Sequence, residues 1–170
     1  MKKMRFVSKQ AYCDRVYHIT PDDLLVVLSR IPEQYWSRVR TIHFNDRAKG
    51  NRILGYVGAR RDEITMCALP PRVSFSPFLV AGQTCAEFGA VYGTQWPITA
   101  VRRFLLYDVF LHEIGHCQQA SPAESEDWEG FAGEKYAQRF ADHWRRKLWQ
   151  TCFVHHDPVH NSPLLFQPQP

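Results

Sequence analysis

The stretch His112-Glu113-Ile114-Gly115-His116 is the part of the sequence on which both the fold and the chemistry depend. Residues four apart lie on one face of an α-helix, so the two imidazoles can bind a single metal ion. Zinc is the usual ion at this spacing, and its catalytic sites leave one position for water. Glu113 then stands where a general base for that water is needed. We therefore predict a Zn²⁺ site on His112 and His116, with Glu113 as the catalytic residue.

The residues before this motif predict that it lies on a long helix. Pro97 suits a helix start near Ile98. A stripe at steps of four or three then runs into the motif and comprises Val101, Leu105, Val109, His112 and His116. Gly115 interrupts the run, and a helical glycine costs roughly 1 kcal/mol relative to alanine. We expect close packing beside the metal site to be the reason for this glycine.

A third protein ligand is expected downstream, because catalytic zinc sites usually have three. The longer pattern H-E-x-x-H-x-x-G-x-x-H is absent, since Gln119 and Pro122 stand where its glycine and third histidine would be. An acidic second helix follows, with an apolar stripe of Ala137, Ala141, Trp144 and Leu148. Glu134 lies on that stripe, where a carboxylate is costly unless it is paired or bound to a metal. Glu134 is therefore the predicted third ligand, with Asp127 or Glu129 as alternatives.

Together with this motif, the segment Glu134-Lys135-Tyr136-Ala137-Gln138-Arg139-Phe140-Ala141 resembles the gluzincin-type HExxH zinc metallopeptidases. Its pattern E-x-x-A-x-x-F-A recurs in small cytosolic members of that group, including repressor-cleaving ones. The resemblance covers roughly residues 98 to 150. It implies Glu113 as general base and three zinc ligands, which are His112, His116 and Glu134. The Tyr or His that often assists the oxyanion in such enzymes has no counterpart here that can be placed.

The region before the motif predicts a small sheet. Alternating polar and apolar residues indicate strands at residues 40–44, 52–58 and 63–69, and the short link between the last two favours an antiparallel hairpin. The resemblance implies a zincin-like α+β fold, in which a small twisted antiparallel or mixed sheet packs on the motif helix and on the ligand-bearing helix. It also implies an edge strand that binds a peptide or protein substrate in extended form. Residues 63–69 are the candidate edge, and an internal strand there is an equal alternative.

The N-terminal part predicts a further strand at residues 15–19 and a helix starting at Thr20. Threonine is a good cap, Pro21 suits the first turn, and two acids favour the positive end of the helix. Pro32 is expected to end this helix, with a second short helical turn within residues 33–39. Residues 72–97 are expected to be a long loop, which either lines the cleft or simply connects two elements.

Composition places the chain among ordinary globular proteins. It has 170 residues, 45% apolar and 22% charged, which fits one domain and excludes wholesale disorder. We assign residues 1–152 to a single catalytic domain and residues 153–170 to a C-terminal tail whose histidines are expected to be exposed. The five cysteines are scattered without a C-x-x-C pair, and no secretory leader is evident, so we expect reduced thiols and a cytoplasmic location. No apolar stretch is long enough for a membrane span.

Some polar side chains remain open to two interpretations. Asp108 lies one turn before His112, where it is either a surface acid or a carboxylate that orients a ligand. Cys117 is expected to be a packed thiol. The net charge is +4, with basic clusters at residues 60–61, 102–103 and 145–147. Such clusters are usually solvated surface, and they support nucleic-acid binding only weakly.

Three functions are consistent with these residues. The first is a zinc metallopeptidase acting on a peptide or protein substrate. The second is a non-catalytic zinc-site protein that binds protein or nucleic acid. The third is a metal-dependent hydrolase of a non-peptide amide, which the sequence does not separate from the first.

Overall fold

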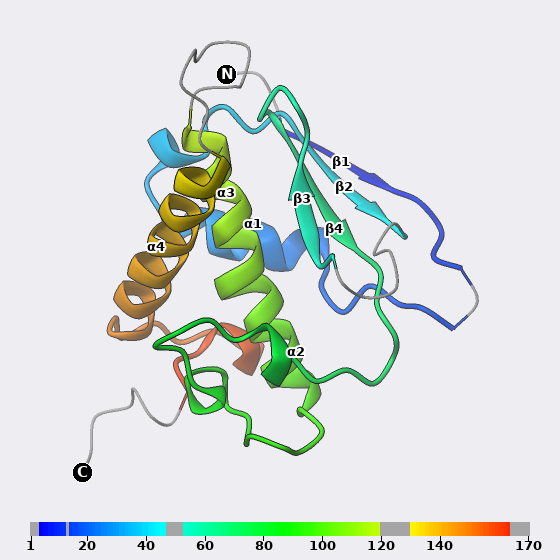
Figure 1. Cartoon of the computed structure of the whole chain (residues 1–170), viewed down its shortest axis with the longest axis vertical. Coiled ribbons are helices and arrows are strands. Elements are labelled where there is room, and N and C mark those ends of the chain that lie inside the picture. Colours follow the sequence, from blue (N-terminus) through cyan, green and yellow to red (C-terminus); the bar gives the residue numbers. More distant parts are fainter. Residues whose placement is uncertain (1–3, 13, 47–52, 120–129, 164–170) are drawn as a thin grey trace.

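The computed structural model describes residues 4–12, 14–46, 53–119 and 130–163. Within them the chain has an α+β fold with a small, open, mixed sheet (Figure 1). The strands are β1 (Arg5–Ser8), β2 (Thr41–Asn45), β3 (Gly55–Val57) and β4 (Glu63–Cys67). The helices are α1 (Pro21–Ser29), α2 (Ile98–Phe104), α3 (Phe110–Gln118) and α4 (Gly130–Trp149).

The strand order in the sheet is β1-β2-β4-β3. β2 runs parallel to both β1 and β4, whereas β3 pairs with β4 in the antiparallel sense, as the hairpin prediction required. The prediction that residues 63–69 form an edge strand is wrong, because β4 has a neighbour on each side. Ile64 and Met66 are fully buried, as expected for a strand inside a sheet. The edge on this side is β3.

The predicted strand at residues 15–19 is also wrong. Only Val16 pairs there, in an isolated bridge to Leu69, while the first strand of the sheet is β1. Arg15 turns its guanidinium to the carboxylate of Asp46 at 2.5 Å instead of standing on a sheet face. A strand needs a partner, and at the N-terminus β2 provides one only for residues 5–8.

Helix α1 begins as predicted. The Thr20 hydroxyl accepts a hydrogen bond from the backbone N–H of Asp23, and the Asp23 carboxylate accepts one from the backbone N–H of Thr20. The helix ends at Ser29, before Pro32, and a short 3-10 turn follows at Glu33–Tyr35. Local capping and proline chemistry therefore account for both ends of this helix.

The motif helix is continuous from Ile98 to Gln118, but a π-helical turn (η4, Leu105–Val109) separates α2 from α3. A π turn inserts one extra residue into the helix, so the side chains before it are rotated about the helix axis relative to those after it. The predicted stripe therefore breaks: Val101 and Leu105 lie in the core, while Phe104 and Asp108 face the same cleft as the motif.

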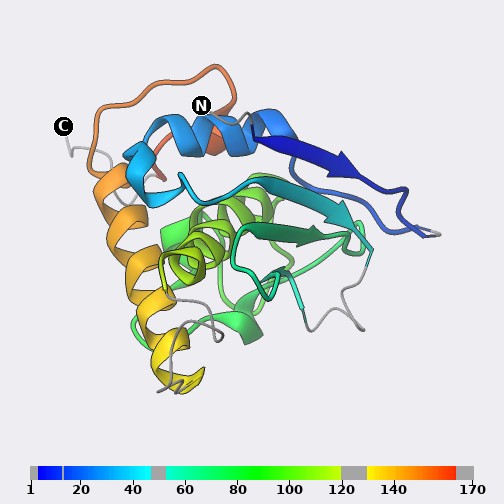
Figure 2. The same ribbon diagram turned by 90° about the horizontal axis from the view of Figure 1, so that it is seen from above.

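Helix α3 lies between the sheet and α4, and the view from above shows the same arrangement (Figures 1 and 2). The close packing predicted at Gly115 is confirmed. A Cβ added there would lie 2.8 Å from Ala137 Cα and 3.2 Å from Phe140 Cβ, so only glycine lets α4 approach this closely. The predicted stripe of α4 is confirmed as well, since Ala137, Ala141, Trp144 and Leu148 are all buried.

The histidine-bearing segment after α4 packs on the rest of the protein. Val159 and His160 are buried, which corrects the expectation of an exposed tail for this part of the chain. The hydroxyl of Tyr107 lies 2.9 Å from His160 Nδ1. Arg102 bridges the carboxylates of Asp23 and Asp157 at 2.8 and 2.7 Å. In the described residues, no helix combines the length and apolar character that crossing a bilayer requires.

Candidate metal centre

The three predicted ligands come together where helices α3 and α4 face the sheet. His112 Nε2 and His116 Nε2, both on α3, lie 3.0 Å apart. The Glu134 carboxylate, near the start of α4, lies 3.2 Å from each of these nitrogens. Among the described residues this is the one group of His, Cys, Asp and Glu side chains arranged to hold a metal ion. The alternative ligands Asp127 and Glu129 lie outside the described residues.

The donor set fits zinc. Zinc binds imidazole nitrogen and carboxylate oxygen at about 2.0–2.2 Å, so tetrahedral ligands lie roughly 3.4 Å from one another. The three separations of 3.0 to 3.2 Å are close to this value. Two neutral imidazoles and one carboxylate also leave a fourth position for water, as catalytic zinc sites do.

Glu134 reaches the histidines for a different reason from the one expected. Its side chain is 64% exposed, so burial on the apolar stripe does not force it to find a partner. Its place is set instead by the close approach of α4 to α3. Burial, followed by the charge of His112, lowers the pKa of His116, which favours the neutral imidazole that binds metals.

Glu113 lies beside these ligands but is buried, with only 6% of its surface exposed. Burial, and then the negative charge of Glu134, raises the pKa of Glu113 to about 8. A carboxyl group with a pKa near neutrality is suited to accepting and releasing a proton during a reaction. The acid predicted to be catalytic is thus in the protected environment that such a role requires.

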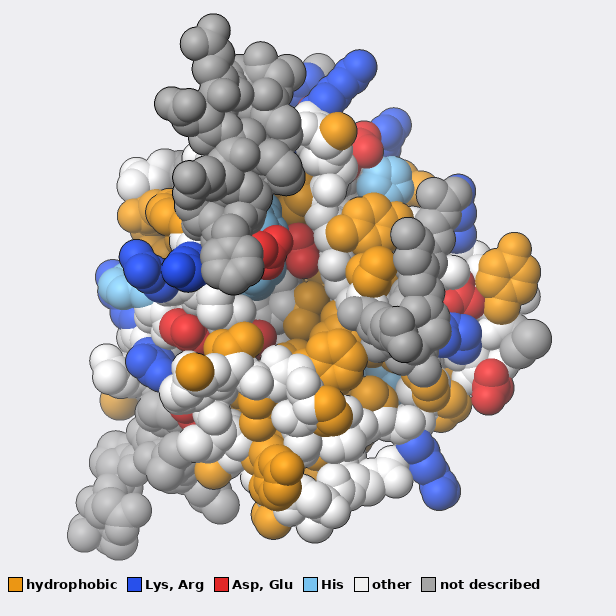
Figure 3. All heavy atoms as spheres, in the orientation of Figure 1, with side chains coloured by type: hydrophobic (Ala, Val, Ile, Leu, Met, Phe, Trp, Pro, Cys, Tyr) orange, Lys and Arg blue, Asp and Glu red, His pale blue; other side chains and the backbone are white. Residues whose placement is uncertain are grey.

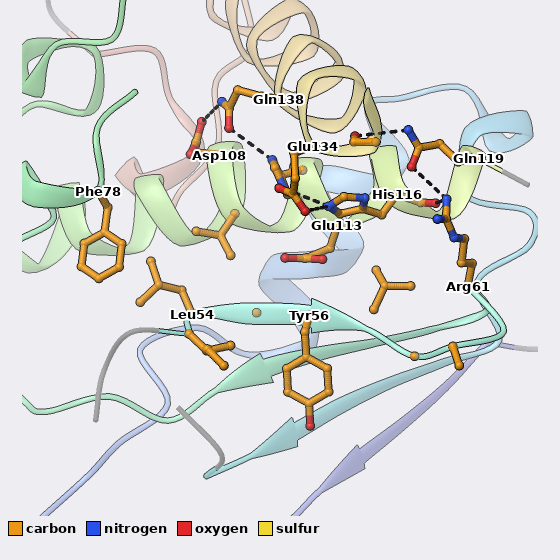
Figure 4. A pocket seen from close by; sticks show the side chains of 18 of the residues that line it. Leu54, Tyr56, Arg61, Phe78, Asp108, Glu113, His116, Gln119, Glu134 and Gln138 are labelled. Atoms are coloured by element: carbon orange, nitrogen blue, oxygen red, sulfur yellow. Dashed lines mark hydrogen bonds and ion pairs between the residues drawn. The ribbon is translucent and has the colours of Figure 1, made fainter. Parts of the chain in front are cut away.

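The three ligands line a cleft of about 700 Å³ between β3 and the helices. Its two ends differ in character (Figure 4). One end is apolar and is formed by Ile53, Leu54, Phe78, Phe104 and Val109, and the other carries Arg61. Figure 3 shows acidic and histidine side chains next to hydrophobic ones on this face of the protein. Phe78 comes from the 72–97 loop, so part of that loop lines the cleft.

Strand β3 presents backbone to this cleft. In the antiparallel ladder Leu54 O accepts from Cys67 N–H and Gly58 N–H donates to Glu63 O, so alternate residues face β4. The backbone groups of Gly55 and Val57, between them, point to the outer edge. No strand in the described part of the chain pairs with that edge.

Gly55 lets this edge approach the motif helix. A Cβ there would lie 3.1 Å from Val109 Cγ1 and 3.4 Å from Glu113 Cγ. Arg61 then ties the hairpin to the end of α3, because its guanidinium donates to His116 O at 3.2 Å and to Gln119 Oε1 at 2.8 Å. Gly55 and Arg61 therefore both hold the β3 hairpin close to α3.

Asp108 is not the surface acid that was the simpler expectation. It is buried, and its carboxylate accepts from Gln138, whose Oε1 lies 3.2 Å from His112 Nδ1. Sequence reasoning missed Gln138, although it stands four residues after Glu134 and so shares its helix face. It also missed Arg145, which was grouped with solvated basic residues but is fully buried against three carboxylates.

The remaining candidates lie away from the metal centre. Cys117 is buried, and burial, with the charge of Glu113, raises its pKa to about 12, so the expected packed thiol is confirmed. His160 faces Tyr107 and lies 3.4 Å from Asp23. Of the basic clusters, Arg103 donates to backbone carbonyls and Arg61 to α3, so neither is a free cation on the surface.

Comparison of the chain with protein-family models, with curated proteins and with solved structures finds no match in any of the three. The family resemblance therefore rests on the two motifs alone. What the site can do follows from its geometry and its donor chemistry.

Proposed function

We propose that this chain is a zinc-dependent metallopeptidase of the gluzincin type, with a zincin-like fold. The observation that carries the proposal is the convergence of two imidazoles and a carboxylate, 3.0 to 3.2 Å apart, beside the buried carboxyl group of Glu113. Zinc sites that only stabilise a fold are usually closed by four ligands and rich in cysteine. A three-ligand site that opens into a cleft and has an acid beside it favours an enzyme.

In the proposed reaction His112, His116 and Glu134 hold the zinc ion. When bound, the ion supplies Lewis acidity, which polarises the scissile carbonyl group and lowers the pKa of water. Glu113 takes a proton from the attacking water and passes it to the nitrogen of the leaving amine. The water oxygen bonds to the carbonyl carbon and the carbon–nitrogen bond breaks, so a carboxylate and a protonated amine are released, the amine nitrogen having taken both protons of the water.

The free edge of β3 is the proposed binding site for the substrate backbone. An extended peptide laid along it would receive hydrogen bonds from the outward N–H groups of Gly55 and Val57 and donate to their carbonyl oxygens. This replaces the 63–69 strand as the candidate edge. The apolar end of the cleft, with Leu54 and Phe78, suits an apolar side chain of the substrate.

The test combines metal content with cleavage. We expect near-stoichiometric zinc in the purified protein, lost in His112→Ala and in Glu134→Ala but kept in Glu113→Gln. The matched control is His143→Ala, because His143 is an exposed histidine on α4. Glu113→Gln should retain the metal and lose cleavage of a peptide library.

Three outcomes would overturn the proposal. No zinc in metal-replete protein would leave an accidental motif on a helix. Zinc that is bound normally, with no cleavage of peptides by the wild type, would favour a non-catalytic zinc-site protein, and cleavage of a small amide alone would favour the non-peptide hydrolase. The cytoplasmic location stays a prediction.

A further inference from the structure

Beside His112 lies a polar cluster that the proposed reaction does not use, and two of its members, Asp108 and Gln138, reach the wall of the cleft. Its members come from three parts of the chain that are distant in sequence: the 72–97 loop, the π turn and α4. They are Gln83, Glu87, Asp108, Gln138, Asp142 and Arg145. Arg145 has no exposed side-chain surface, and Glu87 and Asp108 are also buried. Buried charges on this scale persist only when they are mutually paired and hydrogen-bonded.

Two carboxylate oxygens form the centre of the cluster. Asp108 Oδ1 accepts from Gln83 Nε2 at 2.7 Å, from Gln138 Nε2 at 3.2 Å and from Arg145 at 2.6 Å. Asp142 Oδ1 accepts from the same three side chains, at 3.1, 3.2 and 2.6 Å. Each amide nitrogen therefore uses both of its hydrogens, one on each carboxylate.

Both oxygens are held as acceptors. Burial opposes ionisation of Asp142, but Arg145 and the two amides lower its pKa below the usual value. Burial raises the pKa of Asp108, yet its Oδ1 receives the Arg145 guanidinium at 2.6 Å and so carries no hydrogen of its own. Neither oxygen can donate to Gln138.

This settles the orientation of the Gln138 amide. An Asn or Gln amide is assigned from its hydrogen bonds, since its nitrogen and oxygen have similar shapes. Here the two carboxylates accept only from the NH₂ group, so the oxygen must point the other way. Gln138 Oε1 then faces His112 Nδ1 at 3.2 Å (Figure 4). A carbonyl oxygen is only an acceptor, so the hydrogen of that contact is on Nδ1.

The consequence is a defined tautomer for His112. With the hydrogen on Nδ1, the lone pair of Nε2 points toward His116 and Glu134, where a metal ligand must present it. His112 Nε2 and His116 Nε2 are 3.0 Å apart, so at most one of the two can carry a hydrogen between them.

We propose that Gln138 is a positioning residue, which holds neutral His112 in its Nδ1–H form and points its Nε2 lone pair at the metal position. Arg145 holds the carboxylates of Asp108 and Asp142 in place, and these carboxylates set the orientation of the Gln138 amide. The amide oxygen in turn sets the position of the hydrogen on the His112 ring. The inference rests on the proposed metal site, but the tautomer is a property of the metal-free chain. Loss of such a partner typically weakens metal binding by about 10- to 100-fold.

The test compares Gln138→Met with Gln83→Met. Gln83 makes the same two donations to Asp108 and Asp142 but does not touch His112, so it is a matched control for damage to the cluster. The tautomer of His112 is read from the imidazole ¹⁵N shifts of the metal-free protein at a pH where the ring is neutral. Zinc affinity is measured by competition with a chelator.

We expect wild type and Gln83→Met to keep Nδ1–H, and Gln138→Met to lose it and to bind zinc about 10- to 100-fold more weakly. Gln138→Glu retains an oxygen facing Nδ1, so it should keep the tautomer even as stability falls. It also decides the question if Gln138→Met does not fold.

Unchanged tautomer and zinc affinity in Gln138→Met would overturn the inference. So would equal changes in the two methionine variants, or loss of Nδ1–H in Gln138→Glu, since either would mean that the cluster only stabilises the fold. A chain that binds no zinc but loses Nδ1–H in Gln138→Met would refute the proposed function and leave the positioning role intact.

Discussion

Gly115→Ala tests whether the contact between α3 and α4 builds the metal centre. Alanine in place of a helical glycine gains about 1 kcal/mol from the helix itself. Against this, the new methyl group would lie 2.8 Å from Ala137 Cα and 3.1 Å from Ala137 O. Both atoms belong to the backbone, so the neighbour cannot rotate away and the helices must separate.

The cost of the steric conflict should exceed the gain in helix stability. Overpacking in a well-packed interior costs about 1–3 kcal/mol, and a backbone contact this short belongs at the upper end of that range. Subtracting the helix gain leaves a net loss of about 2 kcal/mol, which corresponds to a fall in Tm of about 4–8 °C for a chain of this size. Because α4 carries Glu134, its displacement should also weaken zinc binding.

The assay is urea unfolding of metal-free protein, since bound metal would add its own stabilisation. Gly133→Ala is the matched control, because a Cβ there would meet only the flexible side chain of Gln119, at 3.1 Å. We expect that variant to be as stable as the wild type or up to about 1 kcal/mol more stable. If Gly115→Ala gained stability in the same way, close helix contact would not be what requires this glycine, and the account of how Glu134 is placed would fail.

Three further predictions concern other parts of the molecule. Burial would raise the pKa of Asp23, but hydrogen bonds with His160 and Thr20 and the charge of Arg102 lower it to about 2. The stabilising effect of the ionised Asp23 is therefore complete above pH ~4 and is lost as the pH falls towards ~2. Asp23→Asn should lower the free energy of unfolding by about 2 kcal/mol at pH 7, and urea unfolding should show this loss shrinking as the pH falls through that window. A loss that stays constant with pH would contradict this. A substrate peptide N-methylated at an amide that pairs with β3 should have a KM raised about tenfold, because one backbone hydrogen bond to a fixed acceptor is lost, and equal KM values for the methylated and parent peptides would argue against strand pairing. The pKa of Cys117 is raised to about 12, so native protein at pH 8 should be alkylated at the exposed Cys152 and not at Cys117, as peptide mapping would show; rapid labelling of Cys117 would mean that α3 opens readily.

Features that depend on neighbours in the sequence were predictable. The i, i+4 spacing of His112 and His116 places both rings on one helix face whatever the rest of the chain does, and the Thr20 cap works through a residue three positions away. Gly115 could be singled out because a helical glycine is locally unfavourable. The strands at β2 and β4 followed from alternation and from β-branched residues.

Other features had no local origin. Whether β3 or β4 is the edge depends on where β2 pairs, and alternation within a strand says nothing about its neighbours. The π turn that brings Asp108 to the cleft side also has no simple periodic pattern.

The buried Arg145 shows most clearly what could not be predicted from the sequence. In the sequence it stands beside Arg146 and Lys147 near a helix end, where a solvated cation is the common case. It is buried because Glu87 and Asp108, 58 and 37 residues away, meet it in the folded chain. Local spacing sets helix faces, caps and the shared face of His112 and His116. How deeply a charged side chain is buried, and which way an amide points, depend on groups that only folding brings together. The free energy gained when these groups pair must offset the cost of removing all of them from water.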